Sequence, residues 1–340
     1  MSKILVTGGA GYIGSHTVRQ LIRAGFEVTV IDNLYSGFRW AVDEAAEFVQ
    51  ADVGNYALVC DLLNDRNIDA VIHFAGYVIV FESVDDPLKY YRNNTANSQR
   101  LIQACQDCGV SQFLFSSTCS VYGESNGKPI SEDTPLNPIN PYARSKLMTE
   151  WMLQDTARGR SPDGQDSAFR YIALRYFNVA GAAVDGGLGQ ATPEATHLIK
   201  VASEVACGKR DKMEIFGTDY PTPDGTCIRD YIHVDDLAAA HVMALGYLLD
   251  GGAATTLNCG YGKGYSVREV VDVMRRVSGR DLIAEESDRR AGDPPVLIAN
   301  NRKIRDTLGW TPQHDDLELI CRNALDWERQ LEDRLVRYTG

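Results

Sequence analysis

Thr7-Gly8-Gly9-Ala10-Gly11-Tyr12-Ile13-Gly14 is the stretch of this 340-residue sequence that decides its fold. A short apolar run, Ile4–Val6, precedes it and has the composition of a buried strand, and a helical pattern follows Gly14 and ends before Gly25. Glycines at positions 8, 11 and 14 permit a tight turn, close approach of the backbone to a pyrophosphate, and close packing of helix against strand. The pattern therefore predicts a dinucleotide site, with the pyrophosphate at the N-terminus of the helix.

Strand-like and helical segments continue to alternate through the first half of the chain. Further short runs rich in Val, Ile or Phe occur at Val28–Ile31, Val71–Phe74, Phe113–Phe115 and Tyr171–Leu174. A helical stretch from about Asp86 to Cys108 stops at Gly109, a residue type that commonly follows a helix. Alternating strands and helices predict an α/β protein with right-handed crossovers and a doubly wound parallel sheet of Rossmann type.

The second half of the chain is more mixed in character. Ser266 and Glu269 form a capping-box pattern that opens one helix, and a further helix is expected over Leu317–Leu331. We expect residues 1–178 to form the dinucleotide-binding domain, with residues 233–260 packing back on it. Residues 179–340 are expected to form a smaller, interleaved lobe of mixed α/β structure that binds the substrate.

An acidic residue ends the second predicted strand. Asp32 lies eighteen residues after Gly14, where a carboxylate accepts hydrogen bonds from ribose hydroxyls and repels a 2′-phosphate, so NAD is favoured over NADP. The alternative interpretation of Asp32 is a turn residue before Asn33. Asp52, after another strand, is a candidate for contact with the adenine. Phe74-Ala75-Gly76 ends the next strand where the cofactor would pass, and core packing explains Phe74 equally well.

Tyr142 and Lys146 lie four residues apart in a segment that starts with Pro141 and looks helical, so both side chains share one helix face. A lysine ammonium near a phenol favours the phenolate and lowers the pKa of the tyrosine. The tyrosinate can then act as a general base toward a sugar hydroxyl. This segment follows a strand that ends in Ser116-Ser117-Thr118, and the carboxyl ends of strands line the ligand crevice of a doubly wound sheet.

Composition argues against several classes of function. The net charge of −12 and the pI of about 5.0 argue against a nucleic-acid partner. The chain shows neither a bilayer-spanning apolar segment nor a signal peptide, so we expect a cytoplasmic protein with no membrane partner. The spacing of Cys105 and Cys108 favours helix packing because no second pair lies near, and the histidines form no metal-binding motif, so no metal is expected.

Several blocks of the sequence resemble the extended short-chain dehydrogenases/reductases. They are the glycine stretch quoted above, His73-Phe74-Ala75-Gly76, Ser116-Ser117-Thr118 and Tyr142-Ala143-Arg144-Ser145-Lys146. The resemblance sharpens to the UDP-glucose (UDP-galactose) 4-epimerase family in two further blocks, Leu174-Arg175-Tyr176-Phe177-Asn178-Val179-Ala180-Gly181 and the run from Ile215 to Val234. It extends from residue 3 to about residue 311.

This resemblance implies an isomerase of nucleotide-sugar and galactose metabolism that is usually homodimeric and keeps its NAD tightly bound. Tyr142 would take the proton of the sugar 4-hydroxyl, Thr118 would share that hydrogen bond, and Lys146 would hold the nicotinamide ribose. Hydride would pass from C4 to NAD and return to the opposite face of the 4-keto sugar after the sugar has turned.

The resemblance also assigns binding residues. Those placed around NAD are Gly8, Gly11, Tyr12, Ile13, Gly14, Asp32, Asn33, Asp52, Val53, Phe74, Ala75, Gly76, Asn94, Ser116, Tyr142, Lys146 and Phe177. Those placed around the UDP-sugar are Thr118, Tyr142, Asn178, His197, Leu198, Phe216, Arg229, Arg290 and Asp293. Arg229 suits a diphosphate by its charge and forked donors; its alternative role is a structural pair with Asp230 or Asp235.

Related sequences differ at positions that bear on the reaction and the sugar. Cys119 and Ser120 stand where sugar-nucleotide 4,6-dehydratases carry the Asp and Glu that eliminate water, which leaves oxidation and reduction alone. Val78, Phe81, Lys200 and Leu297 depart from the commonest 4-epimerase pattern. UDP-glucose and UDP-galactose are the expected pair, and UDP-xylose/UDP-arabinose or UDP-N-acetylhexosamines are the alternatives. A non-catalytic nucleotide-binding sensor is the alternative of a different class.

Overall fold

The structure is a computed structural model that describes residues 1–124, 127–160, 164, 166–290 and 293–339. The chain divides into two compact units, each built from several segments. The first unit contains Met1–Val121, Leu136–Arg175 and Ala238–Leu257, and the second contains Tyr122–Pro135, Tyr176–Leu237 and Asn258–Gly340. The chain therefore passes between the units several times, and neither unit is one continuous stretch of sequence.

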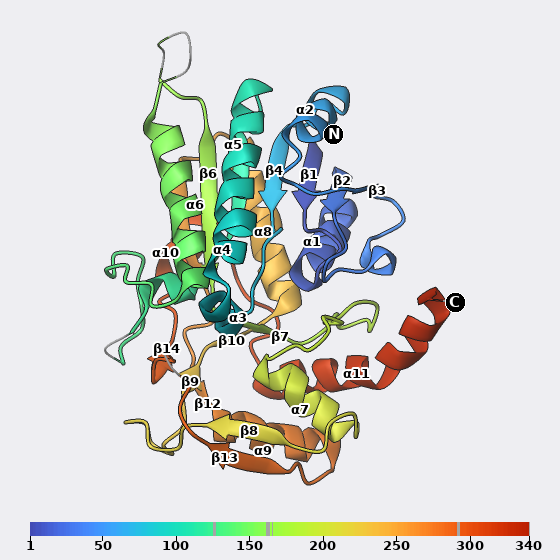
Figure 1. Ribbon diagram of the computed structural model, residues 1–340, viewed down its shortest axis with the longest axis vertical. Coiled ribbons are helices and arrows are strands. Elements are labelled where there is room, and N and C mark those ends of the chain that lie inside the picture. The colour runs from blue at the N-terminus through green and yellow to red at the C-terminus, as the bar shows by residue number, and fades with distance from the viewer. Residues whose placement is uncertain (125–126, 161–163, 165, 291–292, 340) are drawn as a thin grey trace. The chain divides into compact units, whose positions relative to one another are not determined.

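A seven-stranded sheet forms the centre of the first unit (Figure 1). Its order is β3-β2-β1-β4-β5-β6-β11, and β1 pairs in parallel with β2 and β4, β2 with β3, and β4 with β5. The strands are β1 (Lys3–Thr7), β2 (Glu27–Asp32), β3 (Glu47–Gln50), β4 (Ala70–His73), β5 (Gln112–Thr118), β6 (Arg170–Tyr176) and β11 (Thr255–Cys259). The predicted parallel sheet of Rossmann type is confirmed, with Phe74 one residue beyond β4.

Helices cover both faces of this sheet because alternate strand residues point in opposite directions. Leu5 and Ile31 share a hydrophobic core with Leu101 and Leu153 of the helices on one face. On the other face, a Cβ at Gly9 would meet both Val30 of β2 and Val18 of α1. The helices are α1 (Tyr12–Arg23), α2 (Tyr56–Asp65), α3 (Val80–Asp85), α4 (Pro87–Tyr90), α5 (Asn97–Asp107), α6 (Pro141–Arg158) and α8 (Val234–Leu249), with 3-10 turns η1 (Arg39–Ala41) and η3 (Cys119–Tyr122).

Two helices differ from the prediction. α1 begins at Tyr12 and not after Gly14, because Gly11 takes an extended conformation as its N-cap. The helix predicted from Asp86 to Cys108 consists of α4, a π-helical stretch η2 (Tyr91–Ala96) and α5. A π-helical turn holds more residues than an α-helical one, and the hydrophobic pattern gave no sign of it. Gly109 follows α5 with a φ of +75°, as expected of a glycine after a helix.

Short strands and four helices make up most of the described part of the second unit. Its sheets are β10-β7, β12-β9-β14 and β13-β8. The elements are β7 (Asn178–Ala180), β8 (Met213–Phe216), β9 (Ile228–Arg229), β10 (Tyr231–His233), β12 (Tyr265–Ser266), β13 (Ala284–Ser287), β14 (Val296–Leu297), α7 (Leu198–Ala206), α9 (Val267–Ser278), α10 (Arg302–Leu308) and α11 (Leu317–Thr339). The predicted capping box of Ser266 and Glu269 opens α9. The mixed α/β character predicted for this part of the chain is confirmed.

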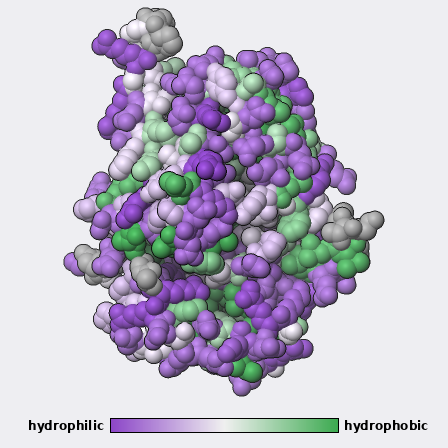
Figure 2. Space-filling model, in the orientation of Figure 1, coloured by the Kyte–Doolittle hydropathy of each residue, from purple (hydrophilic) through white to green (hydrophobic). Residues whose placement is uncertain are grey.

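The surface and the cysteines agree with the composition. Figure 2 shows hydrophilic side chains over most of the face in view, with smaller apolar areas between them. Cys105 lies in the hydrophobic core, as helix packing predicts. Within the described ranges, no helix could cross a membrane and no group of three or more His, Cys, Asp or Glu residues could hold a metal ion.

Candidate active site

The glycine-rich turn between β1 and α1 is packed too closely for side chains. At Gly8, where φ is +72°, a Cβ would lie 2.6 Å from the backbone nitrogen of Ala75. At Gly14, a Cβ would lie 2.2 Å from the carbonyl oxygen of Gly8. Gly11 has no side chain with which to cap the helix, so an anion can satisfy the N–H groups of the first turn, which holds Tyr12 and Ile13.

The residues predicted to bind the adenosine part of NAD lie at the ends of β2 and β3. Asp32 accepts hydrogen bonds from the N–H groups of Ala10 (3.0 Å) and Leu34 (2.8 Å), which connects it to the glycine turn. Burial raises the pKa of Asp32, and these two hydrogen bonds oppose that effect. Asn33 Nδ2 donates to Asp52 Oδ2 at 3.2 Å, and Val53 is buried next to Asp52 in the chain.

The segment after β4 connects the glycine turn to the predicted catalytic lysine. Ala75 contacts Gly8, and a Cβ at Gly76 would lie 3.3 Å from Lys146 Nζ and 3.2 Å from Asn94 Oδ1. Asn94, in the π-helical stretch, accepts the N–H of Tyr77 at 2.8 Å. The structure thus brings Ala75, Gly76, Asn94 and Lys146 together. The ring of Phe74 lies 4.7 Å from that of His241, so Phe74 has a packing role in addition to its predicted one.

Tyr142 and Lys146 lie on the buried face of α6, at 7% and 3% exposure. Lys146 Nζ donates to the carbonyl oxygen of Ser116 at 3.0 Å. Burial lowers the pKa of Lys146 to about 8. An ammonium carries three N–H donors, and one of them is used by a hydrogen bond within the described residues. The other two donors form no hydrogen bond within those residues, and the ammonium lies 5.0 Å from the centre of the Phe115 ring.

Thr118 ends β5, two residues after Ser116, and is buried. Its Oγ1 accepts the N–H of Ser120 at 3.2 Å. The strand β5 therefore contributes both the carbonyl that holds Lys146 and the hydroxyl predicted to contact the sugar. The three predicted catalytic residues therefore lie in one unit, on the adjoining elements α6 and β5.

A buried ion pair, which the sequence analysis missed, attaches α6 to the sheet. Arg175 Nη2 of β6 lies 2.5 Å from Glu150 Oε2 of α6, and both side chains are about 5% exposed. Ser117 of β5 also donates to Glu150. Glu150 follows Lys146 by one helical turn, so this network fixes the helix that carries Tyr142 and Lys146. The available signal was Arg175 directly after the apolar run of β6, which gave no indication of its partner on α6.

In the second unit, four predicted substrate residues form two contacts. Arg229 Nη2 lies 2.5 Å from Asp293 Oδ1, and the Arg290 guanidinium lies 3.7 Å from the centre of the Phe216 ring. The alternative pairing of Arg229 with Asp230 or Asp235 is wrong. Asp230 instead accepts the backbone N–H groups of Tyr261, Gly262 and Ala299, and Asp235 accepts that of Val184. The buried Leu297 is the β14 partner of Arg229 in the sheet.

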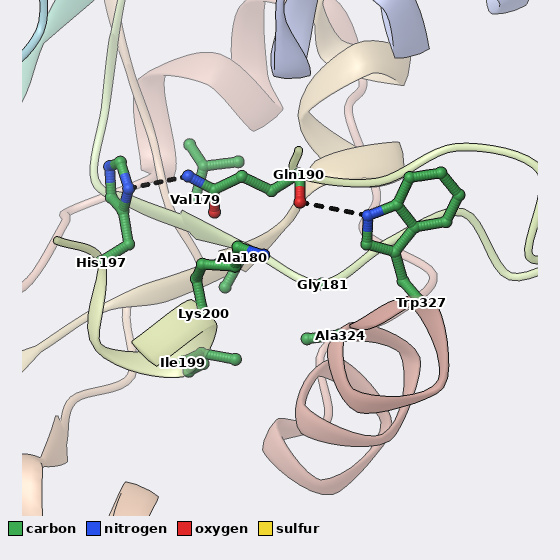
Figure 3. A pocket seen from close by; sticks show the side chains of 9 residues that line it. All are labelled: Val179, Ala180, Gly181, Gln190, His197, Ile199, Lys200, Ala324 and Trp327. Atoms are coloured by element: carbon green, nitrogen blue, oxygen red, sulfur yellow. Dashed lines mark hydrogen bonds between the residues drawn. The ribbon is translucent and has the colours of Figure 1, made fainter. Parts of the chain in front are cut away.

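The remaining predicted residues also belong to the second unit. Phe177 is buried, and Asn178 pairs with Tyr231 at the start of β7. His197 precedes Leu198, the first residue of α7. Figure 3 shows the His197 ring facing Gln190, whose Nε2 lies 2.9 Å from His197 Nδ1, beside a cavity that Lys200 and Trp327 also line. Contacts of these residues with NAD or a UDP-sugar remain predictions.

Comparison with known proteins identifies the family of this chain. The chain matches the model of the NAD dependent epimerase/dehydratase family over residues 4–260 and belongs to that family. It is 54% identical to the UDP-glucose 4-epimerase of Azospirillum brasilense over 97% of this chain and 93% of that protein. The resemblance to the UDP-glucose 4-epimerases is therefore confirmed.

Two solved structures extend this likeness to three dimensions. The UDP-glucose 4-epimerase from Brucella ovis in complex with NAD has a TM-score of 0.92 and 44% identity over 97% of this chain and 99% of its own. The UDP-Glc/GlcNAc 4-epimerase from Campylobacter jejuni has a TM-score of 0.83 and 51% identity over 97% and 100%. The fold predicted from the glycine turn is thus shared with proteins of this activity.

Proposed function

We propose that this protein is an NAD-dependent 4-epimerase that interconverts UDP-glucose and UDP-galactose. The observation that carries the proposal is the buried Lys146, which lies against Gly76 and the end of β5 on the helix that carries Tyr142. The residues present fit NAD: the two remaining donors of Lys146 suit the nicotinamide ribose, and the glycine turn with Asp32 suits the pyrophosphate and adenosine ribose. Membership of the family and the NAD in the Brucella ovis relative support this assignment.

In this proposal Tyr142 is the base that acts on the 4-hydroxyl of the sugar. Its phenolate accepts the hydroxyl proton as the C–H bond at C4 breaks, and returns the proton once the keto sugar has turned. The positive charge of Lys146 stabilises the phenolate, and the Ser116 carbonyl fixes the ammonium. Thr118 donates a hydrogen bond to the same sugar oxygen. NAD, when bound, supplies the acceptor for the C4 hydride and gives the hydride back.

The residues next to Thr118 limit the chemistry to oxidation and reduction. Cys119 and Ser120 begin η3 directly after β5, so a thiol and a hydroxyl occupy positions that flank the proposed sugar site. Elimination of water needs an acid and a base of suitable pKa at such positions. Neither side chain supplies a carboxylate, so elimination of water is disfavoured and hydride returns to C4.

The second unit is proposed to hold the UDP part of the substrate. Arg229 and Arg290 suit the diphosphate by charge and by their planar, forked donors. Asp293, which already accepts from Arg229, is proposed to accept from the uridine ribose, and Phe216 to pack near the uracil. Asn178, His197 and Leu198 complete the proposed set.

The decisive test is an assay of the purified protein without added cofactor. The protein should carry NAD, which chromatography of the denatured sample would detect, and should convert UDP-galactose to UDP-glucose and back. Absence of conversion of every UDP-sugar tested would refute the proposal. A protein that carries NAD but shows no turnover would favour the nucleotide-sensor alternative.

Epimerisation of UDP-N-acetylhexosamines is the second candidate, and one position favours it. Leu297 departs from the commonest 4-epimerase pattern, has a shorter side chain than a tyrosine, and is the sheet partner of Arg229, next to the proposed diphosphate site. The Campylobacter jejuni relative is named for both UDP-Glc and UDP-GlcNAc. A side-by-side assay of the hexose, N-acetylhexosamine and xylose/arabinose pairs distinguishes these candidate substrates, with Leu297→Tyr as the variant. The variant should lose at least about tenfold in kcat/KM on N-acetylated sugars relative to hexoses.

We also propose that the protein acts in the cytoplasm as a homodimer. Buried thiols such as Cys105 and Cys259 suit a reducing compartment. Sedimentation of the purified protein tests the dimer, and fractionation of its cells tests the location.

A further inference from the structure

Two tyrosines meet across the glycine turn. β1 lies between β4 and β2 in the sheet, and the glycine turn follows β1. Tyr35 comes from the loop after β2 and Tyr77 from the segment after β4, and their ring centres are 4.7 Å apart with 54° between the planes. A contact between rings from the two flanking strands must pass over the carboxyl end of the strand between them.

Both segments are fixed to the glycine turn itself. On the β2 side, Phe38 donates its N–H to the Ala10 carbonyl at 3.0 Å, and a Cβ at Gly37 would lie 2.7 Å from the Ala10 carbonyl carbon. On the β4 side, Ala75 is packed against Gly8. The backbone on each side of the ring pair is therefore fixed to the glycine turn, so the contact between the two rings is a defined feature of the structure.

The backbone that presents Tyr35 is held in a costly conformation. Leu34 has a φ of +60°, a left-handed value that residues other than glycine seldom adopt. Side chains of the preceding residues stabilise it, because Asp32 accepts the Leu34 N–H and Asn33 accepts the Tyr35 N–H at 3.0 Å. The residue proposed to bind the adenosine ribose thus also directs Tyr35.

A lysine caps the two rings. Lys89 Nζ of α4 lies 4.8 Å from the centre of the Tyr77 ring and 5.3 Å from that of Tyr35, and it donates to the Tyr35 hydroxyl at 3.0 Å. Glu82 of α3 forms an ion pair with Lys89 and accepts from Tyr90 at 2.7 Å. Three partners, Tyr35, Tyr77 and Glu82, therefore position Lys89, although it lies outside the hydrophobic core.

The row of rings continues to the catalytic tyrosine. Tyr77 lies 5.8 Å from Tyr90, and Tyr90 lies 6.5 Å from Tyr142, edge to face. The Tyr90 hydroxyl holds the backbone of Ile79, so the segment between Tyr77 and α3 is fixed as well. The row therefore extends from the loop beside Asp32 to the proposed base, along the path that an extended dinucleotide would follow.

We propose that Tyr35, Tyr77 and Lys89 form a clamp that closes over the pyrophosphate of NAD and keeps the dinucleotide bound between turnovers; this rests on the function proposed above. Fold stability does not account for the clamp, because Tyr35 is 59% exposed and an exposed ring buries little apolar surface. A ring pair with a cation above it is a specific, reversible contact. It must open for NAD to leave, so it slows release.

The test measures release of NAD from purified holoenzyme. Protein is mixed with an excess of isotopically labelled NAD, and bound label is followed with time. Tyr35→Ala and Tyr77→Ala should each speed release by about tenfold, which corresponds to about 1.4 kcal/mol. Lys89→Met should also speed release, and Tyr35→Phe, which keeps the ring, should release more slowly than Tyr35→Ala. Tyr56→Ala is the control, because Tyr56 is a 40% exposed tyrosine of the same unit on α2.

The outcomes separate the clamp from the proposed function. A wild-type protein that carries no NAD would refute the proposed function itself. A wild-type protein that carries NAD while Tyr35→Ala, Tyr77→Ala and Lys89→Met release it at the wild-type rate would refute the clamp alone. Circular dichroism identifies any alanine variant that fails to fold, and Lys89→Met, which should release NAD faster than wild type, then decides whether the clamp holds NAD. Faster release from Tyr56→Ala as well would also overturn the proposal, because the effect would not be specific to the clamp.

Discussion

The buried ammonium of Lys146 should make the dinucleotide-free protein less stable at neutral than at alkaline pH. Burial lowers the pKa of Lys146 from 10.5 to about 8 in the folded state, whereas the unfolded chain has the ordinary value. Between these two pKa values the unfolded state binds more protons than the folded state, so the free energy of unfolding rises with pH. Below pH 8 both states are protonated, and the full penalty of burying the charge is present.

The size of this effect follows from the two pKa values. A shift from 10.5 to about 8 corresponds to a penalty of about 3 kcal/mol at low pH. Of this, about 1.4 kcal/mol is removed between about pH 7 and about pH 9. Lys146→Met keeps the length of the side chain and removes the titrating group. Groups that do not interact with Lys146 titrate alike in both proteins, so the difference between wild type and variant reports Lys146 together with the groups coupled to it.

Urea unfolding at about pH 7, 8 and 9, followed by circular dichroism, gives the free energy of unfolding of both proteins. The difference in stability between Lys146→Met and wild type should change by about 1.4 kcal/mol across this range, in the direction that favours wild type at high pH. Lys303→Met, a change at an exposed lysine of α10, is the control and should show no such trend. The same difference at all three pH values would refute the reasoning from burial.

Three further changes test the site and its support. Tyr142→Phe should lower kcat by about 10²–10⁴-fold, the usual contribution of a general base, while the NAD content of the purified protein stays at the wild-type level; an unchanged rate would overturn the assignment of the base. Glu150→Gln should lower the free energy of unfolding by about 3–5 kcal/mol, because Arg175 loses its buried partner, and should lower Tm by about 4–7 °C. The control Glu318→Gln removes an exposed partner of Arg322 and should cost less than about 1 kcal/mol. Gly14→Ala should reduce the NAD retained after gel filtration, because its Cβ would lie 2.2 Å from the Gly8 carbonyl oxygen; full retention would contradict the role of the turn.

The sheet was predictable because its strands are buried on both faces and therefore appear as continuous apolar runs. This pattern located five strands, β1, β2, β4, β5 and β6. β3 was placed only as a strand before Asp52, because its half-exposed sequence Glu47–Gln50 forms no apolar run that would set its bounds. The π-helical stretch was also invisible, because one extra residue in a turn leaves no mark on the hydrophobic period over so short a length.

The local part of the candidate site was predictable, and the long-range part was not. Tyr142 and Lys146 are one helical turn apart, so their shared face follows from the sequence alone. The partner of Arg229 is 64 residues away, at Asp293, and not at position 230 or 235, the nearer carboxylates that were its alternative partners. The same holds for the ion pair of Glu150 with Arg175 and for the ring contact of Tyr35 with Tyr77, since side-chain pairs between distant segments depend on how the chain folds.

The register of β9 with β14 has a consequence for how this family could acquire new substrates. Lateral partners in a sheet point to the same face, so Leu297 and Arg229 share one surface and are both buried. A substitution at Leu297 that enlarges or reduces the space for the sugar therefore also changes the packing around Arg229, the residue proposed to hold the diphosphate. Selection or engineering for another sugar should then proceed through paired changes, in which a second substitution near Asp293 restores the affinity that the first one costs.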